Sequence, residues 1–319
     1  MESEQILITD LKEVEATTVS KLEEAGFTNI ESIAITPMQE LVEKTCISNE
    51  TAVKLLQKVR DILGLEYITA LEFYKKKQND KRLTTGTNNL DMLLGGGIEM
   101  RAITEFIGEY GTGKSQICMQ LCVTAQKPSE RGGFGGKVLF IDTEGTFSPQ
   151  RVHDIAEARG LEPRKILENI IYVRCYNSDH QIFIVNKAAK VVKEEKIKLI
   201  IVDSIIGHFR GEYVGKEMLV KRQQLLNQHI HRLLRLAELY NCSVVITNQI
   251  QTNPSGFVFG DPNRPAGGNV VAHASTHRLY IRKGKANTRV IHVIDSPYLP
   301  EEKTRFVITA SGVEDIKDK

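Results

Sequence analysis

The sequence predicts an α/β fold with a mostly parallel sheet, preceded by a small all-helical domain. Short apolar strands alternate with helical segments from about residue 83 onward, which is typical of a parallel sheet covered by helices on both faces. A glycine-rich turn at residues 108–115 joins an apolar run to a helical segment. Before residue 65 the apolar residues recur at helical spacing. We therefore expect a helical domain at residues 1–65, a linker at 66–82 and an α/β core at 83–319.

The glycine-rich turn has the pattern Gly-x-x-x-x-Gly-Lys-Ser, which is a phosphate-binding loop. Its glycines let consecutive backbone N–H groups point at an anion, and the following helix adds its positive N-terminal end. Lys114 is expected to reach the terminal phosphates, and Ser115 to hold Mg²⁺ through its hydroxyl. A glycine-rich turn without a ligand is the weaker alternative, because the strand before it and the helix after it are the setting that the motif requires. The expected nucleotide contacts are Gly108, Glu109, Tyr110, Gly111, Thr112, Gly113, Lys114, Ser115 and Gln116.

The charge of the chain is unevenly distributed. The formal net charge is only +2, so the whole-chain charge favours neither nucleic acid nor membrane as a partner. The first 65 residues contain roughly 6 basic and 12 acidic side chains, which leaves a basic excess in the core. Any site for a polyanion is therefore expected in the core.

Cysteine usage and hydropathy indicate a cytoplasmic protein. The five cysteines form no Cys-x-x-Cys pair, which suits a reducing compartment and argues against a disulfide framework or a zinc site. The N-terminal residues lack the apolar stretch of a signal peptide, and no run is long enough to span a bilayer. We expect no membrane partner.

The helical domain and the linker each leave two interpretations open. The helices expected around Leu22 and at residues 38–44 and 49–63 look like a helix-hairpin-helix domain. Its first turn has one glycine and its second has none, so direct DNA binding and a protein-contact or structural role both remain possible. In the linker, the Tyr67-x-x-Ala70 element would either add a short strand to the sheet of another molecule or anchor the linker to its own domain.

Three polar residues follow buried strands of the core. Asp203 ends the strand at residues 199–202 and is expected to order Mg²⁺ and its waters, the alternative being a cap on the next helix. Glu144 follows the strand at 138–142 and is the candidate general base, because a carboxylate there can polarise water in line with the terminal phosphate. Gln249 follows the strand at 244–248, where its amide can touch that phosphate and report its loss.

Two segments next to these residues are candidates for a DNA channel. Residues 251–268 contain four glycines and three prolines with little periodicity, as in a long functional loop. Residues 209–216 lead from the Asp203 strand into a helix that carries Lys221 and Arg222. Spaced cations beside a nucleotide sensor would bind DNA in an ATP-dependent way, whereas a solvated basic face is the alternative.

Six motifs together carry a family resemblance: residues 108–115, 140–147, 199–204, 209–213, 247–249 and 295–297. Their order and spacing resemble the RecA-like DNA strand-exchange recombinases, above all the archaeal RadA branch, over nearly the whole chain. The segments at 140–147, 267–269 and 272–276 are specific to that branch. The resemblance implies a RecA-like P-loop ATPase core behind the helix-hairpin-helix domain.

The resemblance also implies roles that residue types alone do not give. Tyr67 and Ala70 would dock on the sheet of the neighbouring protomer, and Asp295 and Pro300 would cap the ATP that the neighbour holds. Arg151 would stack on adenine, and His273 would lie near the terminal phosphate. The implied DNA-binding residues of the two loops are Arg210, Lys216, Arg222, Val258, Phe259 and Gly268.

Four positions depart from the family pattern. The docking aromatic is usually Phe rather than Tyr67, and Ser148 stands where Arg is common. Lys216 replaces an arginine, so a compact ammonium group stands where a rigid, planar guanidinium is usual. Gly211 occupies a position often filled by Ala, which loosens the first loop.

The motifs together predict an ATP- and Mg²⁺-dependent recombinase that forms filaments or rings, binds single-stranded and double-stranded DNA, and associates with the nucleoid. Glu144, Lys114 and Gln249 are its expected catalytic residues. One rival is a mediator that loads another recombinase, but it is expected to lack the helical domain or part of the ATP and loop residues. The other is a ring translocase of the same superfamily, which the cation-bearing first loop and the Tyr67 linker disfavour.

Overall fold

The computed structural model describes residues 8, 11, 14–27, 29–65, 67–252 and 263–316. By its internal contacts the chain divides into two compact units, Met1–Asn79 and Asp80–Lys319. Among the described residues, no helix is both long and apolar enough to cross a membrane.

The first unit is helical. Its helices are α1 (Ala16–Glu24), α2 (Ile30–Ala34), α3 (Met38–Thr45), α4 (Asn49–Ile62) and α5 (Ala70–Gln78). The side chains of Asn29 and Ser48 accept hydrogen bonds from the first turns of α2 and α4, which fixes where these helices begin. Leu22, Ile33 and Leu41 lie fully buried in the core that α1 to α4 share.

Helix α5 lies in the segment that the sequence indicated as a linker. Thr69 and Glu72 form a reciprocal capping box at its start, and a box of this kind satisfies two free N–H groups of the first turn. Lysines occupy its last turn, where positive charge stabilises a helix. No side chain of α5 is buried, so its caps and charges account for the helix better than packing does.

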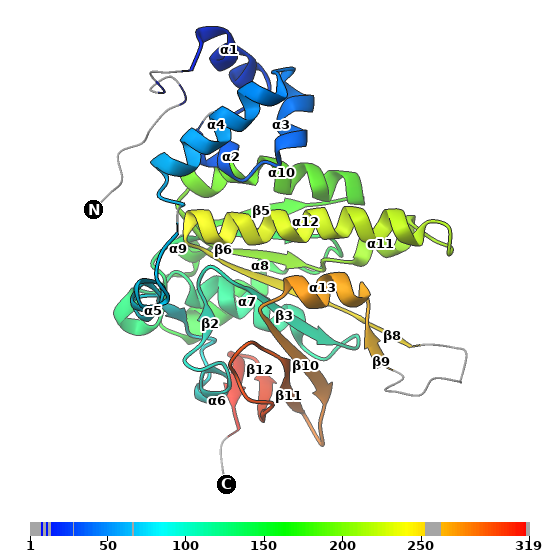
Figure 1. Ribbon diagram of the computed structural model, residues 1–319. Coiled ribbons are helices and arrows are strands. Elements are labelled where there is room, and N and C mark those ends of the chain that lie inside the picture. Colours follow the sequence, from blue (N-terminus) through cyan, green and yellow to red (C-terminus); the bar gives the residue numbers. More distant parts are fainter. Residues whose placement is uncertain are drawn as a thin grey trace. The chain divides into compact units, whose positions relative to one another are not determined.

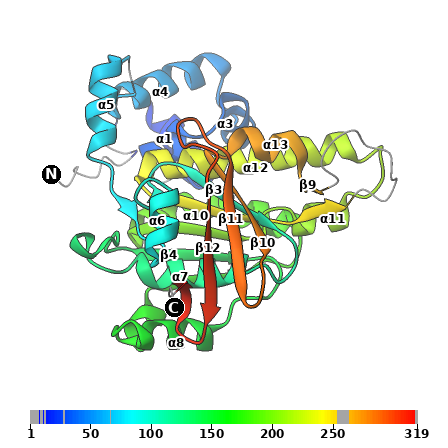
Figure 2. The same cartoon turned by 90° about the horizontal axis from the view of Figure 1, so that it is seen from below.

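The second unit is built on one nine-stranded sheet, coloured from cyan to red in Figure 1. In spatial order its strands are β13 (Gly312–Asp315), β12 (Lys303–Thr309), β11 (Thr288–Asp295), β10 (His277–Lys283), β3 (Ile103–Gly108), β7 (Ser243–Asn248), β6 (Ile197–Asp203), β4 (Lys137–Asp142) and β5 (Ile170–Arg174). All pairings from β10 to β5 are parallel. Figure 2 shows the antiparallel strands β10, β11 and β12 extending the sheet beyond β3.

Helices cover both faces of the parallel part (Figure 1). Helices α10 (Ser178–Glu194) and α12 (Leu219–Tyr240) pack together on one face, and α7 (Lys114–Thr124), α8 (Pro149–Ala158) and α9 (Pro163–Glu168) form the opposite layer. Strands β3 and β7 are therefore buried along their whole length, as is typical of central strands in a parallel sheet covered on both faces.

Shorter elements complete the second unit. They are β1 (Arg82–Leu83), α6 (Asn88–Leu93), β2 (Ile98–Glu99), a 3-10 turn (Ser129–Arg131), α11 (Gly207–Glu212), β8 (Ile250–Thr252), β9 (Asn263–Pro265) and α13 (Gly268–Ala274). Strands β8 and β9 pair antiparallel, a ribbon that the sequence did not predict within residues 251–268. The α/β class with a mostly parallel sheet is confirmed.

A buried histidine makes the stability of the second unit depend on pH. Burial, reinforced by nearby Arg232, lowers the pKa of His229 from 6.5 to about 3. Below pH 6.5 His229 is therefore protonated in the unfolded chain but stays neutral in the folded chain. The free energy of unfolding falls as the pH falls. The expected loss in the free energy of unfolding is about 1.4 kcal/mol per pH unit down to about pH 3.

We expect His229→Gln to weaken this acid dependence, because glutamine has no proton to gain. Urea unfolding of both proteins at pH 7 and pH 4 measures the difference in slope. His231→Gln, at an exposed position of the same helix, is the matched control and is expected to leave the slope unchanged. Equal slopes for the wild type and His229→Gln would contradict the assignment.

Candidate nucleotide site and adjoining basic segments

The phosphate-binding loop has a backbone that only glycine adopts without strain. Gly111 has φ +74° and Gly113, which precedes α7, has φ +105°, and both values lie in the left-handed region. A Cβ atom on Gly113 would lie 2.6 Å from Ile308 Cδ1, and one on Gly108 would lie 2.5 Å from the Ile281 carbonyl oxygen. The neighbouring strands β10 and β12 therefore leave no room for side chains in this turn.

Three of the expected site residues meet beside the loop. Lys114 Nζ donates hydrogen bonds to the carbonyl oxygens of Gly108 (2.8 Å) and Glu109 (3.0 Å). Burial lowers the pKa of Lys114, against the opposing effect of the Asp203 and Glu144 carboxylates. Asp203 is buried at the end of β6, where its carboxylate accepts hydrogen bonds from Ser115 and Thr247. Burial raises the pKa of Asp203, although these two donors oppose the rise.

The candidate general base lies at the convergence of three strand ends. Glu144 follows β4, and its Oε1 atom accepts hydrogen bonds from Ser204 Oγ (2.8 Å) and Gln249 Nε2 (2.6 Å). Ser204 follows β6 and Gln249 follows β7. The structure therefore brings Glu144 and Gln249 together, and it adds a serine hydroxyl to which the sequence assigned no role.

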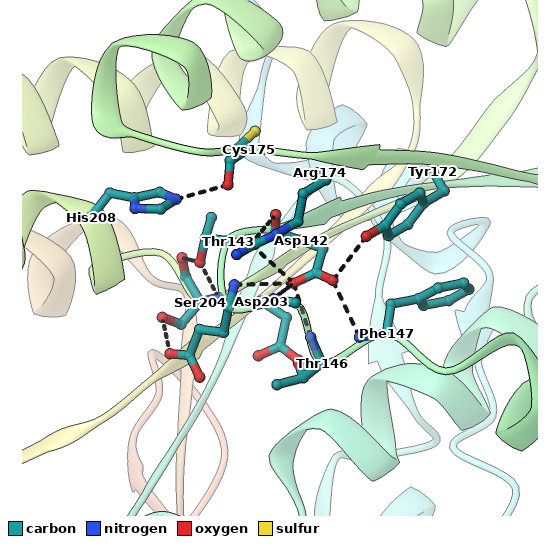
Figure 3. A network of polar contacts seen from close by, with 12 residues as sticks. Asp142, Thr143, Thr146, Phe147, Tyr172, Arg174, Cys175, Asp203, Ser204 and His208 are labelled. Carbon is teal, nitrogen blue, oxygen red and sulfur yellow. Dashed lines mark hydrogen bonds and ion pairs between the residues drawn. The ribbon is translucent and has the colours of Figure 1, made fainter.

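A buried aspartate fixes the segment that carries Glu144 (Figure 3). The side chain of Asp142 is fully buried, and its Oδ1 atom accepts the backbone N–H groups of Glu144 (3.0 Å), Gly145 (2.6 Å) and Thr146 (3.3 Å). Its Oδ2 atom accepts the N–H of Phe147 at 3.2 Å. Sequence reasoning missed this role, although an aspartate followed by Gly and Thr after a strand is typical of a turn held by its own side chain.

Two residues of β5 complete the surroundings of Asp142 (Figure 3). The Tyr172 hydroxyl donates to Asp142 Oδ2 at 3.1 Å, and the Arg174 guanidinium donates to the Asp142 carbonyl oxygen at 3.0 Å. The Tyr172 ring stacks on Phe147 with 5.0 Å between centroids. Burial and the nearby Asp142 carboxylate raise the pKa of Tyr172.

Arg151 lies beside the first turn of α7. Ser148 caps α8 by accepting the Arg151 N–H at 3.2 Å, so the residue that departs from the family pattern helps to place this arginine. The Arg151 side chain donates to Gln116 Oε1 at 2.7 Å and to the carbonyl oxygens of Thr309 (2.6 Å) and Ala310. These bonds hold the guanidinium next to Gln116, and stacking on adenine stays a prediction.

Asp295 and Pro300 do not meet the phosphate-binding loop of their own chain. Asp295 ends β11 opposite Arg278, near the start of β10, whereas Gly108 lies opposite Ile281 near the end of β10. These levels differ by three residues, or roughly 10 Å along the strand. Asp295 therefore lies at another level of the sheet from the loop, and Pro300 lies in the turn between β11 and β12. The action of both residues on the ATP of a neighbour stays a prediction.

The two candidate DNA-binding segments leave the same strand ends that carry the polar site. Arg210 is exposed on α11, which follows β6, and exposed Lys216 lies between α11 and α12. Arg222 belongs to α12. Gly268, the first residue of α13, lies 4.0 Å from Gln223 Nε2 when measured from an added Cβ atom, so the ends of the two segments are close. Val258 and Phe259 fall outside the described residues.

Three predicted positions remain, two in the linker and one on α13. Tyr67 is fully exposed, and Ala70 is the first residue of α5. His273 is exposed in the last turn of α13. Contacts of these residues with another protomer or with a phosphate stay predictions.

We expect Tyr172→Phe to lower the free energy of unfolding by about 1 kcal/mol, because it removes one hydrogen bond to a buried carboxylate. Urea unfolding measures the loss. Tyr176→Phe, which removes a hydroxyl from a more exposed tyrosine on the same segment, is the control and is expected to stay within about 0.5 kcal/mol of the wild type. If the two variants had equal stability, the Tyr172 hydroxyl would have no role in holding Asp142.

Comparison with known proteins places the chain in a family. The family model described as Rad51 matches residues 76–316. The chain is 47% identical over 308 residues to the DNA repair and recombination protein RadA of Aeropyrum pernix, which covers 97% of this chain and 96% of that protein. It is 47% identical over 324 residues to the RadA of Cenarchaeum symbiosum, covering 100% and 81% of the two chains.

A third relative agrees with these two. The RadA of Metallosphaera sedula is 45% identical over 312 residues, covering 98% of this chain and 96% of its own. The matches therefore extend through both units of the structure. The phosphate-binding loop, the carboxylates at the strand ends and these likenesses lead to one conclusion: the chain belongs to the Rad51 family.

Proposed function

We propose that this chain is a DNA-dependent ATPase that acts as a recombinase in DNA repair, forming filaments on single-stranded DNA and pairing it with homologous duplex. The observation that carries the proposal is the 2.6 Å hydrogen bond from Gln249 to Glu144. It joins the candidate general base to the residue that leads into the second candidate DNA-binding segment. This hydrogen bond therefore connects the proposed nucleotide site with a segment that we propose binds DNA.

ATP and Mg²⁺ fit the residues that are present. The glycine loop offers backbone N–H groups and the start of α7 to phosphates, and the Lys114 ammonium lies within the same turn. The Ser115 hydroxyl and the Asp203 carboxylate are oxygen donors of the kind that Mg²⁺ prefers. Bound Mg²⁺ would neutralise phosphate charge. Arg151, which is held beside Gln116, would contact the adenine.

Glu144 is the proposed general base. Two donors converge on its Oε1 atom, and the N–H of its own backbone is held by Asp142. Its carboxylate is therefore oriented before any substrate binds, which lowers the cost of reaching a reactive geometry. The contact from Gln249 would change when the terminal phosphate is lost, because we propose that the same amide also hydrogen-bonds that phosphate.

DNA would bind along Arg210, Lys216, Arg222 and the segment from Val258 through Gly268. Cations held on exposed positions suit a phosphate backbone rather than base edges, so the sequence would be read by base pairing between strands. ATP then acts as a switch: it orders these segments when bound and releases them after hydrolysis. A DNA substrate would place the protein with the nucleoid in the cytoplasm.

Assembly of several copies would complete the nucleotide site. Asp295 lies at another level of the sheet from the phosphate loop of its own chain, and Pro300 follows it in the turn before β12, so both are available to cap the ATP of a neighbour. Tyr67 is fully exposed just before α5, in a position to dock with Ala70 on another copy. A filament or ring built from these contacts would have one ATP at each interface.

The first experiment is joint-molecule formation between single-stranded DNA and homologous or unrelated duplex, with ATP and Mg²⁺. We expect pairing only with the homologous duplex. Lys114→Ala is expected to abolish hydrolysis, since it removes the cation from the phosphate loop. Lys190→Ala, at the exposed i,i+4 pair of α10, is the control and should keep both activities. Hydrolysis stimulated by DNA without any pairing would instead favour a translocase or a mediator.

Tyr67→Ala is expected to give folded monomers, because it removes the proposed docking side chain and leaves the core of each unit intact. Size-exclusion chromatography with light scattering measures the assembly state, and circular dichroism checks folding. Tyr74→Ala, an exposed tyrosine on α5 itself, is the matched control that should still assemble. Assemblies of normal size from Tyr67→Ala would remove Tyr67 from the interface.

A further inference from the structure

A buried carboxylate and a buried histidine meet at the end of β10 that lies away from the phosphate-binding loop. Glu99 of β2 is 4% exposed, and His277, the first residue of β10, is 1% exposed. His277 Nε2 lies 2.8 Å from Glu99 Oε2. Neither side chain belongs to the candidate nucleotide site. Burial of an ionisable pair costs solvation free energy, which only good geometry and further hydrogen bonds offset.

Two more side chains contact this pair. The Tyr298 hydroxyl donates a hydrogen bond to the same Glu99 oxygen, and Arg82 Nη2 donates to the Tyr298 hydroxyl at 2.7 Å. Arg82 Nη2 also lies 3.6 Å from Glu99 Oε2. Tyr298 as a whole is exposed, so its hydroxyl reaches the buried carboxylate from a position at the surface. We call Arg82, Glu99, His277 and Tyr298 the Glu99 cluster.

The Glu99 cluster contacts the turn that follows β11, which we call the cap loop (residues 295–300). Ser296 Oγ lies 3.1 Å from His277 Nδ1 and accepts the backbone N–H of Leu299 at 3.0 Å. Leu299 packs against the core of the second unit, and its Cδ2 would lie 3.3 Å from a Cβ atom added to Gly95. The middle of the cap loop is therefore fixed by polar and apolar contacts together.

The donors and acceptors in these contacts are complementary. Ser296 Oγ accepts a backbone N–H, so its own proton can be donated to His277 Nδ1. The Nε2–H of the same ring then donates to Glu99. The Tyr298 hydroxyl accepts from Arg82 and donates to Glu99. The buried carboxylate is thus connected to the cap loop by two routes, through the histidine and through the tyrosine.

The two ends of the cap loop carry the proposed cap residues. Asp295 and Pro300 are both exposed, and Asp295 Oδ2 lies 3.8 Å from Arg278 Nη1. The contacts with the Glu99 cluster are made between these ends, at Ser296 and Tyr298. A loop that is fixed in its middle has few alternative conformations, so its end residues lose little entropy when a ligand binds.

We propose that the Glu99 cluster positions the cap loop, so that Glu99, His277 and Tyr298 are positioning residues for the ATP of a neighbouring copy. The inference rests on the proposed function, since it takes Asp295 and Pro300 as the cap. A contact made equally with bound ATP and with the transition state changes KM and leaves kcat unchanged. A misplacement of about 1 Å can cost about a hundredfold, so we expect about a tenfold effect where the other contacts of the loop remain.

The test measures KM and kcat for ATP with saturating single-stranded DNA. Tyr298→Phe keeps the ring and removes the hydroxyl that reaches Glu99. We expect KM to rise about tenfold and kcat to stay within about twofold of the wild type, with assemblies of normal size by light scattering. Tyr176→Phe removes a hydroxyl from another exposed tyrosine, just before α10, and should keep the KM of the wild type.

Two further variants address the loop and the cap separately. Ser296→Ala removes the contact with His277 from the loop side and should raise KM in the same way. It leaves every member of the Glu99 cluster in place, so it keeps the test decisive if Tyr298→Phe is poorly folded. The double variant Asp295→Ala with Pro300→Ala removes both cap side chains and should raise KM at least as much.

Mixed assemblies test whether the Glu99 cluster acts on the ATP of a neighbour. Glu144→Gln lacks the proposed base but keeps the phosphate loop and the cap loop. In a mixture with Tyr298→Phe, only the Tyr298→Phe copies hydrolyse ATP, and some of them have a Glu144→Gln neighbour with an intact cap loop. We expect that part of the hydrolysis to regain the KM of the wild type. A mixture in which all hydrolysis keeps the raised KM would overturn the inference.

The outcomes separate this inference from the proposed function. If removal of both cap side chains left KM unchanged, the cap role in the proposed function would be wrong. If that double variant raised KM while Tyr298→Phe and Ser296→Ala did not, the positioning role of the Glu99 cluster alone would be overturned. A fall in kcat or in the free energy of unfolding with a normal KM would also overturn it, since the cluster would then only support the fold.

Discussion

The in-register parallel pairing of four strands is the constraint on which the site depends. Asp142 of β4 lies opposite Asp203 of β6, and Ile107 of β3 lies opposite Asn248 of β7. Parallel strands end at the same edge of a sheet, so the residues that follow them meet there. A slip of one residue in any pair would turn the side chains to the other face and separate Glu144 from its donors.

The buried carboxylates at this edge of the sheet are stable because hydrogen-bond donors surround them. An isolated ionised carboxylate loses much solvation free energy on burial, yet Asp142 accepts four backbone N–H groups and a tyrosine hydroxyl. The four N–H groups belong to the segment that carries Glu144. The bonds that stabilise the buried charge therefore also fix the backbone of the base, and stability and positioning come from the same atoms.

The sequence predicted the parts of the site that are local in the chain. The phosphate loop, Asp203, Glu144 and Gln249 each follow an apolar strand, so a motif and a strand end were enough to find them. The Ser204 hydroxyl on Glu144 and the Tyr172 hydroxyl on Asp142 join residues that are 60 and 30 positions apart. Such contacts depend on strand order and register, which no local pattern encodes. The same holds for the ribbon of β8 and β9. Helix α5 was not predicted either, although its capping box of Thr69 and Glu72 is a local signal.

Strand order also explains why the proposed nucleotide site and the candidate DNA-binding segments should be coupled in this chain. The strand that ends in Asp203 continues into α11, and the strand before Gln249 continues into β8. Both candidate DNA-binding segments therefore begin within a few residues of the donors that hold Glu144. Under the proposed function, DNA that reorders a segment would pull on the serine or the glutamine that precedes it, because each is bonded to one carboxylate oxygen. Because the serine and the glutamine share one acceptor atom, Glu144 Oε1, a movement of either segment would reach the candidate base through that atom.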